Sequence, residues 1–125
     1  MNTRELAEMI ERFQLGPATV GFLPGPPEVA KVELDATSPN KARTLLRWLD
    51  FINVQDMVAG KFRASDLQVR LNIRGRFPSG DWVIVVAAFH EQSEAAQVEL
   101  INDAIHRQQP LTLITQLAAL EDATA

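Results

Sequence analysis

The chain contains no cysteine and no tyrosine among its 125 residues. The lack of cysteine excludes disulfides, thiolate nucleophiles, thiolate metal sites and iron–sulfur clusters, and it fits a reducing compartment. The lack of tyrosine removes one of the side chains that act as general acids. No apolar run approaches the roughly 20 residues of a membrane-spanning helix, and the charged start MNTRELAEMIERF does not resemble a secretory signal. We therefore expect a cytoplasmic protein with no membrane partner.

Catalytic and phosphate-binding patterns are also missing from the sequence. No serine stands in a G-x-S-x-G context, and the glycines do not form a phosphate-binding loop. His90 and Glu91 begin like the zinc-binding pattern H-E-x-x-H, but Glu94 occupies the place of the second histidine. We therefore expect no catalytic residue, no metal and no cofactor. A small hydrolase or isomerase without a recognisable motif stays open as an alternative.

The residues that are present indicate one α+β domain spanning residues 1–125. With 46% hydrophobic residues, the chain can build one real core but is too short for two. The net charge of −4 argues against nucleic acid as the main partner. Residues 61–76 carry five basic residues and one acid, whereas residues 91–125 carry six acids and one base. Such blocks can neutralise each other within a subunit or across the two-fold axis of a homodimer.

Capping signals predict where three helices begin. A capping box of Asn2 and Glu5 starts the first helix, and the Gly-Pro pair at residues 16–17 ends it. Ser38 and Ser93 are expected to cap a second and a third helix.

Alternating hydrophobicity predicts two hairpins, a short one over residues 18–35 and a long one over residues 68–91. The pattern weakens over residues 53–65, and Gly60 marks the loop expected to lead into the long hairpin. Residues 111–120 fit both a strand and a helix, and the helix is favoured. The economical fold is a meandering four-stranded antiparallel sheet with three or four helices mainly on one face.

The long hairpin carries the functional hypothesis. With a tight turn at residues 79–80 and Phe77 opposite Trp82, one face of the hairpin is apolar and faces the core. That face includes Ile84, Val86 and His90. The other face then sets Arg70, Arg74 and Arg76 beside Val83, Val85 and Phe89.

Three explanations for this arginine face stay open. The acidic third helix or the tail covers it through Glu99, Asp103 or Glu121. Alternatively, another protein or a second copy of this chain docks there, because arginine forks bind carboxylates well beside apolar neighbours. A third possibility is a pocket for a small anion such as a nucleotide, with Phe89 or Trp82 available for stacking.

Trp48 and Phe51 widen the apolar band of the second helix. One interpretation is burial between the sheet and the first helix. The other is a subunit interface, where aromatic residues are enriched.

The element order, the size and the acidic balance resemble those of class I type III secretion chaperones, which are small homodimers that hold an extended partner segment. The third consecutive strand that such chaperones place before their second helix is not evident here. Small inhibitors encoded by phages or plasmids share the compact, acidic, cysteine-free character. We therefore expect a non-enzymatic protein-binding module, such as an adaptor, chaperone or inhibitor. It acts through Arg70, Arg74, Arg76, Val85 and Phe89, and sequestration of a small anionic ligand is the alternative.

Overall fold

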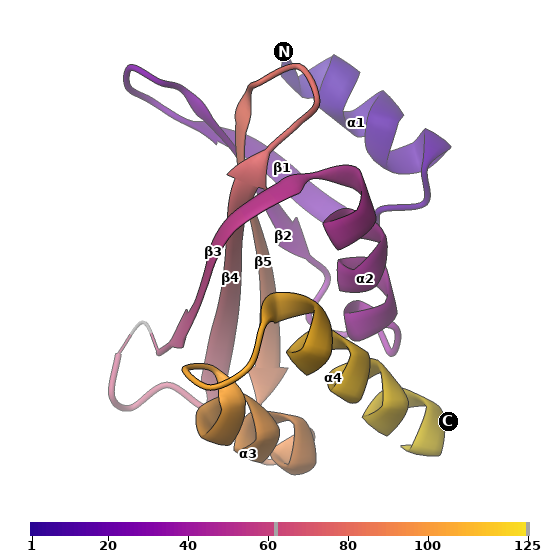
Figure 1. Cartoon of the computed structure of the whole chain (residues 1–125), viewed down its shortest axis with the longest axis vertical. Helices are drawn as coiled ribbons and strands as arrows, with labels where there is room; N and C mark the ends of the chain where they lie inside the picture. Colours follow the sequence, from indigo (N-terminus) through magenta and orange to yellow (C-terminus); the bar gives the residue numbers. More distant parts are fainter. Residues whose placement is uncertain (62, 125) are drawn as a thin grey trace.

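The computed structural model describes residues 1–61 and 63–124, which form one five-stranded sheet and four helices (Figure 1). In chain order the elements are α1 (Thr3–Arg12), β1 (Ala18–Leu23), β2 (Val29–Leu34), α2 (Lys41–Phe51), β3 (Asn53–Gly60), β4 (Gln68–Arg76), β5 (Trp82–His90), α3 (Ala95–Ala104) and α4 (Pro110–Thr124). In this part of the chain, no helix combines the length and the hydropathy needed to cross a bilayer.

The strand order is β1-β2-β5-β4-β3, and every neighbouring pair is antiparallel except β2 and β5, which run parallel. The α+β class is therefore confirmed, but the four-stranded, purely antiparallel sheet is wrong. The extra strand is β3, in the segment where the sequence pattern weakens and no strand was expected. Its alternation is broken by a register shift between Val54 and Asp56, which explains why the sequence pattern there is weak.

The helix signals were only partly accurate. The N–H of Glu5 donates to Asn2 Oδ1 at 2.9 Å, so the predicted cap of α1 is confirmed. By contrast, α2 begins three residues after Ser38, and α3 begins two residues after Ser93. The ambiguous tail is the helix α4.

The register of the long hairpin differs from the prediction by one residue. Arg76, not Phe77, lies opposite Trp82. The N–H of Phe77 donates to the carbonyl of Asp81 at 2.9 Å, which leaves a three-residue loop in which Gly80 adopts a φ of 93°. A loop of this kind favours glycine at the left-handed position. The prediction assumed a loop one residue longer, and such an error turns every side chain of β5 to the opposite face.

The two faces of β5 are consequently exchanged. Val83, Val85 and Phe89 are fully buried in the core beneath the helices, so their placement beside the arginines is wrong. Trp82 and Ile84, expected in the core, lie on the other face of the sheet.

That other face carries none of the described helices. In Figure 1, α1 and α2 lie to the right of the strands, α4 packs below α2, and α3 lies beneath the ends of β4 and β5. We call the uncovered side the open face. It is formed by Thr19, Gly21, Leu23, Val29, Lys31, Glu33, Asn53, Asp56, Val58, Gly60, Gln68, Arg70, Asn72, Arg74, Arg76, Trp82, Ile84, Val86, Ala88 and His90.

The aromatic band of α2 belongs to the core. Trp48 is 0% exposed, and its Nε1–H donates to the carbonyl of Leu15 at 2.9 Å. Phe51 is half-buried between Phe13 and Phe77, with ring centroids 5.0 and 6.2 Å away. The interface interpretation is therefore wrong for Trp48, because no surface of this residue is available to a second subunit.

Candidate functional site: the open face of the sheet

Strand pairing arranges the open face in rows that cross all five strands. Directly paired residues point to the same side of a sheet, so each row is read from the register. The row nearest the long hairpin's loop is Leu23, Val29, Trp82, Arg76 and Asn53, and the next is Gly21, Lys31, Ile84, Arg74 and Asp56. An apolar strip from β1 to β5 thus borders the arginines of β4.

Trp82 is the centre of the first row. The guanidinium carbon of Arg76 lies 4.2 Å from the centroid of the Trp82 ring, and that of Arg74 lies 5.9 Å away. Cation–π contacts at exposed sites contribute about 0.5–1 kcal/mol each. They hold both guanidinium groups beside a half-buried aromatic ring, so less side-chain entropy is lost when a ligand binds there.

The cations of this face are unequally neutralised. Arg74 pairs with Asp56, and Glu33 pairs with Lys31 at 3.0 Å and lies 4.0 Å from Arg70. Arg76 makes no ion pair with any carboxylate in residues 1–61 and 63–124. Four cations therefore stand against two carboxylates on the strands of this face, in a chain whose net charge is −4.

Two hollows lie at the other end of the open face, on either side of Gln68 and Arg70. The first, of about 390 Å³, has Val86 and Ala88 among its lining residues, together with carboxylates that include Glu33. The second, of about 520 Å³, is lined by Arg63, Ser65, Asp66, Leu67 and His90 as well as Gln68 and Arg70.

The position of His90 also corrects an expectation. It was expected to close the core face of its strand, but it pairs with Gln68 and points to the open side, half-buried. Its Nδ1 accepts hydrogen bonds from the N–H groups of Gln92 at 3.1 Å and Ser93 at 3.4 Å. In the neutral imidazole the hydrogen is therefore on Nε2, and His90 is one of the residues that line the second hollow. In the described chain no group of three His, Asp or Glu residues could hold a metal ion.

The acidic residues expected to cover the arginines lie elsewhere. Glu121 accepts hydrogen bonds from the N–H groups of Ala42 at 2.5 Å and Arg43 at 3.3 Å, so it caps the N-terminus of α2. Burial raises the pKa of the Glu121 carboxyl, against the lowering effect of these two donors. Asp103, near the end of α3, pairs with Arg107 in the turn that follows this helix. The internal-cover explanation is therefore wrong for these residues.

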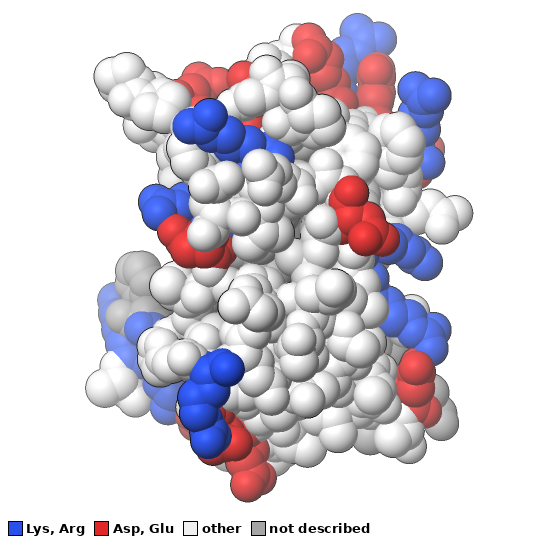
Figure 2. Space-filling view, in the orientation of Figure 1, with Lys and Arg blue, Asp and Glu red and all other residues white. Residues whose placement is uncertain are grey.

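Glu99 lines a separate groove of about 550 Å³ between α3 and α4, together with Asp103, Leu100 and Leu120. On the side of the molecule shown in Figure 2, charged side chains gather around the margin, and uncharged atoms fill most of the surface over α4. This groove is acidic at its rim and does not resemble the open face.

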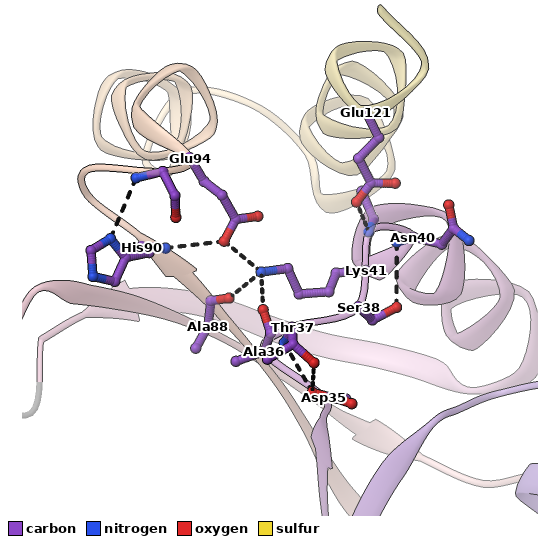
Figure 3. A network of polar contacts seen from close by, with 12 residues as sticks. Asp35, Ala36, Thr37, Ser38, Asn40, Lys41, Ala88, His90, Glu94 and Glu121 are labelled. Carbon is purple, nitrogen blue, oxygen red and sulfur yellow. Dashed lines mark hydrogen bonds and ion pairs between the residues drawn. The ribbon is translucent and has the colours of Figure 1, made fainter. Parts of the chain in front are cut away.

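A buried lysine is the feature that the sequence analysis missed. Lys41 is 1% exposed, and its Nζ donates to the carbonyls of Ala36 at 3.0 Å and Ala88 at 2.7 Å and to Glu94 Oε1 at 2.6 Å (Figure 3). The ammonium also lies 4.7 Å from the centroid of the Phe89 ring. With all three donors used, it connects α2 to β5 and α3 and serves structure. A cation in the first turn of a helix interacts unfavourably with the helix dipole. The position of Lys41 at the start of α2 was therefore the feature of the sequence that could have indicated a specific role for this lysine.

The loop before α2 holds this lysine in place. Thr37 donates to Asp35 Oδ1 through its hydroxyl at 2.7 Å and its N–H at 2.9 Å, and Ser38 Oγ accepts from the N–H of Asn40 (Figure 3). The hydrogen bonds from Thr37 lower the pKa of Asp35. This turn presents the carbonyl of Ala36 to Lys41.

Of the predicted site residues, the structure brings together Arg70, Arg74 and Arg76 on the open face and removes Val85 and Phe89 to the core. The fold and this face define an α+β protein with one uncovered, mixed apolar and basic sheet surface. No protein-family model, no curated protein and no solved structure matches the chain. None of these comparisons links it to the class I type III secretion chaperones.

Proposed function

We propose that this chain is a non-enzymatic protein-binding module that holds an acidic segment of a partner protein on its open face. The observation that carries the proposal is Trp82 with Arg76 and Arg74 at its ring, on a sheet face that no described helix covers. Tryptophan and arginine dominate the binding energy of protein interfaces when they stand together in a water-excluding setting.

The chemistry of the face favours an acidic partner with an apolar anchor. No carboxylate in the described part of the chain pairs with Arg76, so its guanidinium group can bind a carboxylate of a partner. An arginine fork binds a carboxylate through two parallel hydrogen bonds. Leu23, which is 39% exposed, and Val29 continue the apolar surface on the far side of Trp82. An apolar side chain of the partner packs on this strip while neighbouring carboxylates reach the guanidinium groups.

Selection of random peptides tests this proposal without knowledge of the natural partner. We expect peptides selected on the wild-type protein to be acidic and to contain an aromatic or aliphatic anchor. Arg76→Glu replaces one charge-assisted contact by repulsion, so binding of the selected peptides falls at least tenfold, since a hydrogen bond to a charged group contributes about 1.5–3 kcal/mol. Arg4→Glu is the matched control, because Arg4 is exposed on α1 and pairs with Glu8.

Arg4→Glu keeps the melting temperature of the wild-type protein, because exposed charges contribute little to stability. Arg76→Glu lowers it by only about a few degrees, because it loses one exposed contact with the Trp82 ring. Selected peptides that are neutral or basic, or that bind Arg76→Glu as tightly as the wild type, would refute the proposal.

The second hollow gives a specific reason to keep a small anion as the alternative ligand. Arg63, Ser65, Gln68, Arg70 and His90 line it together with Asp66, and its volume is about 520 Å³. Stacking on Phe89 plays no part, because this residue is fully buried. Millimolar nucleotide or inorganic phosphate then raises the melting temperature of the wild type but not of Arg63→Ala. A flat response in both proteins removes this alternative.

A further inference from the structure

The two edges of the sheet differ in how they are protected against pairing with another strand. The β3 edge carries Asp56 and a register shift next to it, and both features discourage pairing. The β1 edge consists of the six residues Ala-Thr-Val-Gly-Phe-Leu, with no charge and no register shift along its pairing with β2. By these criteria β1 is the open edge.

The backbone of β1 shows which groups point away from the sheet. The N–H of Asp35 donates to the carbonyl of Pro17 at 3.0 Å, and hydrogen-bonded and non-hydrogen-bonded pairs alternate along an antiparallel ladder. The N–H and C=O groups of Ala18, Val20 and Phe22 therefore point outward, on the side where β1 has no neighbouring strand in the described sheet. These outward N–H and C=O groups can form backbone hydrogen bonds with one more strand.

An apolar hollow lies alongside this edge. It has a volume of about 480 Å³ between α1 and β1, and its lining includes Ala7, Ile10, Ala18 and Val20. Side chains of an added strand that alternate towards α1 enter this space, so pairing of the backbone and burial of apolar surface occur together.

We propose that a second copy of this chain pairs with β1 in antiparallel fashion, which makes one continuous ten-stranded sheet. When a strand pairs with its own copy across a two-fold axis, its side chains lie next to side chains of the same strand in the second copy, so the two sets must not repel each other. Residues 18–23 meet this condition, because they carry no charge that would face its own copy. The side chains of Val20 and Phe22 in each copy also face the apolar hollow of the other copy. Apart from Leu23, this inference uses residues other than those of the proposed function.

Light scattering over a range of protein concentrations tests the proposal. We expect a dimer for the wild type and a monomer, or a dimer at least tenfold weaker, for Val20→Pro, since proline removes an outward N–H that the β2 ladder does not use. Gly21→Glu provides a second test should Val20→Pro fold poorly. A Cβ at Gly21 meets nothing within 4 Å, and two copies of Glu at this position repel across the axis.

Crosslinking of single introduced cysteines shows which edge of the sheet forms the dimer contact. The chain has no cysteine of its own, so each introduced thiol reacts alone. A short bis-maleimide that spans the roughly 4.5–8 Å between cross-strand neighbours should join two copies of Gly21→Cys. Val58→Cys on the β3 edge, where Val58 is 55% exposed, is the matched control and should stay uncrosslinked. A wild-type monomer at all concentrations, or a dimer that survives both β1 variants and crosslinks through Val58→Cys, overturns the proposal. Arg76→Glu should leave the dimer intact, so failure of this inference is distinct from failure of the proposed function.

Discussion

Replacing Lys41 by methionine should cost a large part of the stability of this domain. Methionine keeps most of the volume of the side chain, so the main change is the loss of the buried ammonium. The carbonyls of Ala36 and Ala88 lose their donor, and the Glu94 carboxylate, whose side chain is 24% exposed, loses its cation. Breaking a buried ion pair in this way costs about 3–5 kcal/mol. Small domains are stable by only about 5–15 kcal/mol, so the melting temperature should fall by on the order of 10 °C.

Urea unfolding followed by tryptophan fluorescence measures this loss, because Trp48 is fully buried in the folded chain. The matched control is Lys31→Met, which makes the same substitution in an ion pair with Glu33 whose side chains are 38% and 43% exposed. Exposed pairs contribute about 0–1 kcal/mol, so the control should stay close to the wild type. A double-mutant cycle with Glu94→Gln separates the pairwise energy from the loss of the two carbonyl partners. Equal losses for Lys41→Met and Lys31→Met would refute the reasoning.

Two further predictions concern the contact of α4 with α2 and the close approach of β3 to β4. Burial raises the folded-state pKa of Glu121 above its ordinary value of 4.5, so this group's contribution to stability is complete below that value and is lost as the pH rises through the raised pKa. Urea unfolding between about pH 4 and 7 should show that slope in the wild type and not in Glu121→Gln, and identical slopes would contradict the assignment. A Cβ at Gly75 would lie 2.5 Å from the carbonyl oxygen of Asn53, so Gly75→Ala should cost about 1–3 kcal/mol in the same assay, whereas Gly21→Ala should change stability by less than about 0.5 kcal/mol. A Gly75→Ala protein as stable as Gly21→Ala would show that the close approach of the two strands is relaxed in solution.

The local signals of the sequence were reliable where a single side chain decides the outcome. Asn2 caps α1 because its carboxamide oxygen reaches the N–H of Glu5, and Gly80 marks the hairpin loop because the chain takes a positive φ there. Both effects act within a few residues, so the sequence carries them completely.

The register of the long hairpin was not accessible in this way. The strand β5 reads WVIVVAAFH, which is apolar on both faces, so alternation could not show which side is buried. Only the length of the loop therefore set the register. The hydrogen bond from the N–H of Phe77 to the carbonyl of Asp81 closes a three-residue loop, and no pattern in the sequence distinguishes it from a four-residue loop. Trp82 and Ile84 are the apolar residues of β5 that face outward, and both belong to the candidate site. Because both faces of β5 are apolar, the sequence could predict neither the register nor the place of these two residues in the site.

Non-local pairing explains the remaining differences. The parallel pairing of β2 with β5 joins segments separated by α2, β3 and β4, and no local pattern encodes it. The contact of Lys41 with Glu94 spans 53 residues, and only the assembled core brings the two groups together. The sequence therefore predicted the α+β class and the arginine-bearing strand, whereas strand order and the buried ion pair depend on tertiary packing.

The two proposed surfaces fit together in one geometry. Antiparallel pairing of β1 with its own copy about a two-fold axis perpendicular to the sheet keeps both open faces on the same side. Two strand positions separate Trp82 from the β1 edge in each copy, so at about 4.8 Å per strand the two tryptophans lie about 24 Å apart across the strands. Trp82 is level with Leu23 at the end of β1, so antiparallel pairing centred on Val20 also offsets the two tryptophans by about six residues, or roughly 20 Å, along the strands. The separation is then about 31 Å, which an extended segment covers with roughly ten residues. Binding at the second copy is then intramolecular once the first is occupied, and affinity for a long acidic segment increases without any new type of contact. In the proposed dimer, the uncharged edge would place two copies of the basic face within reach of a single partner chain.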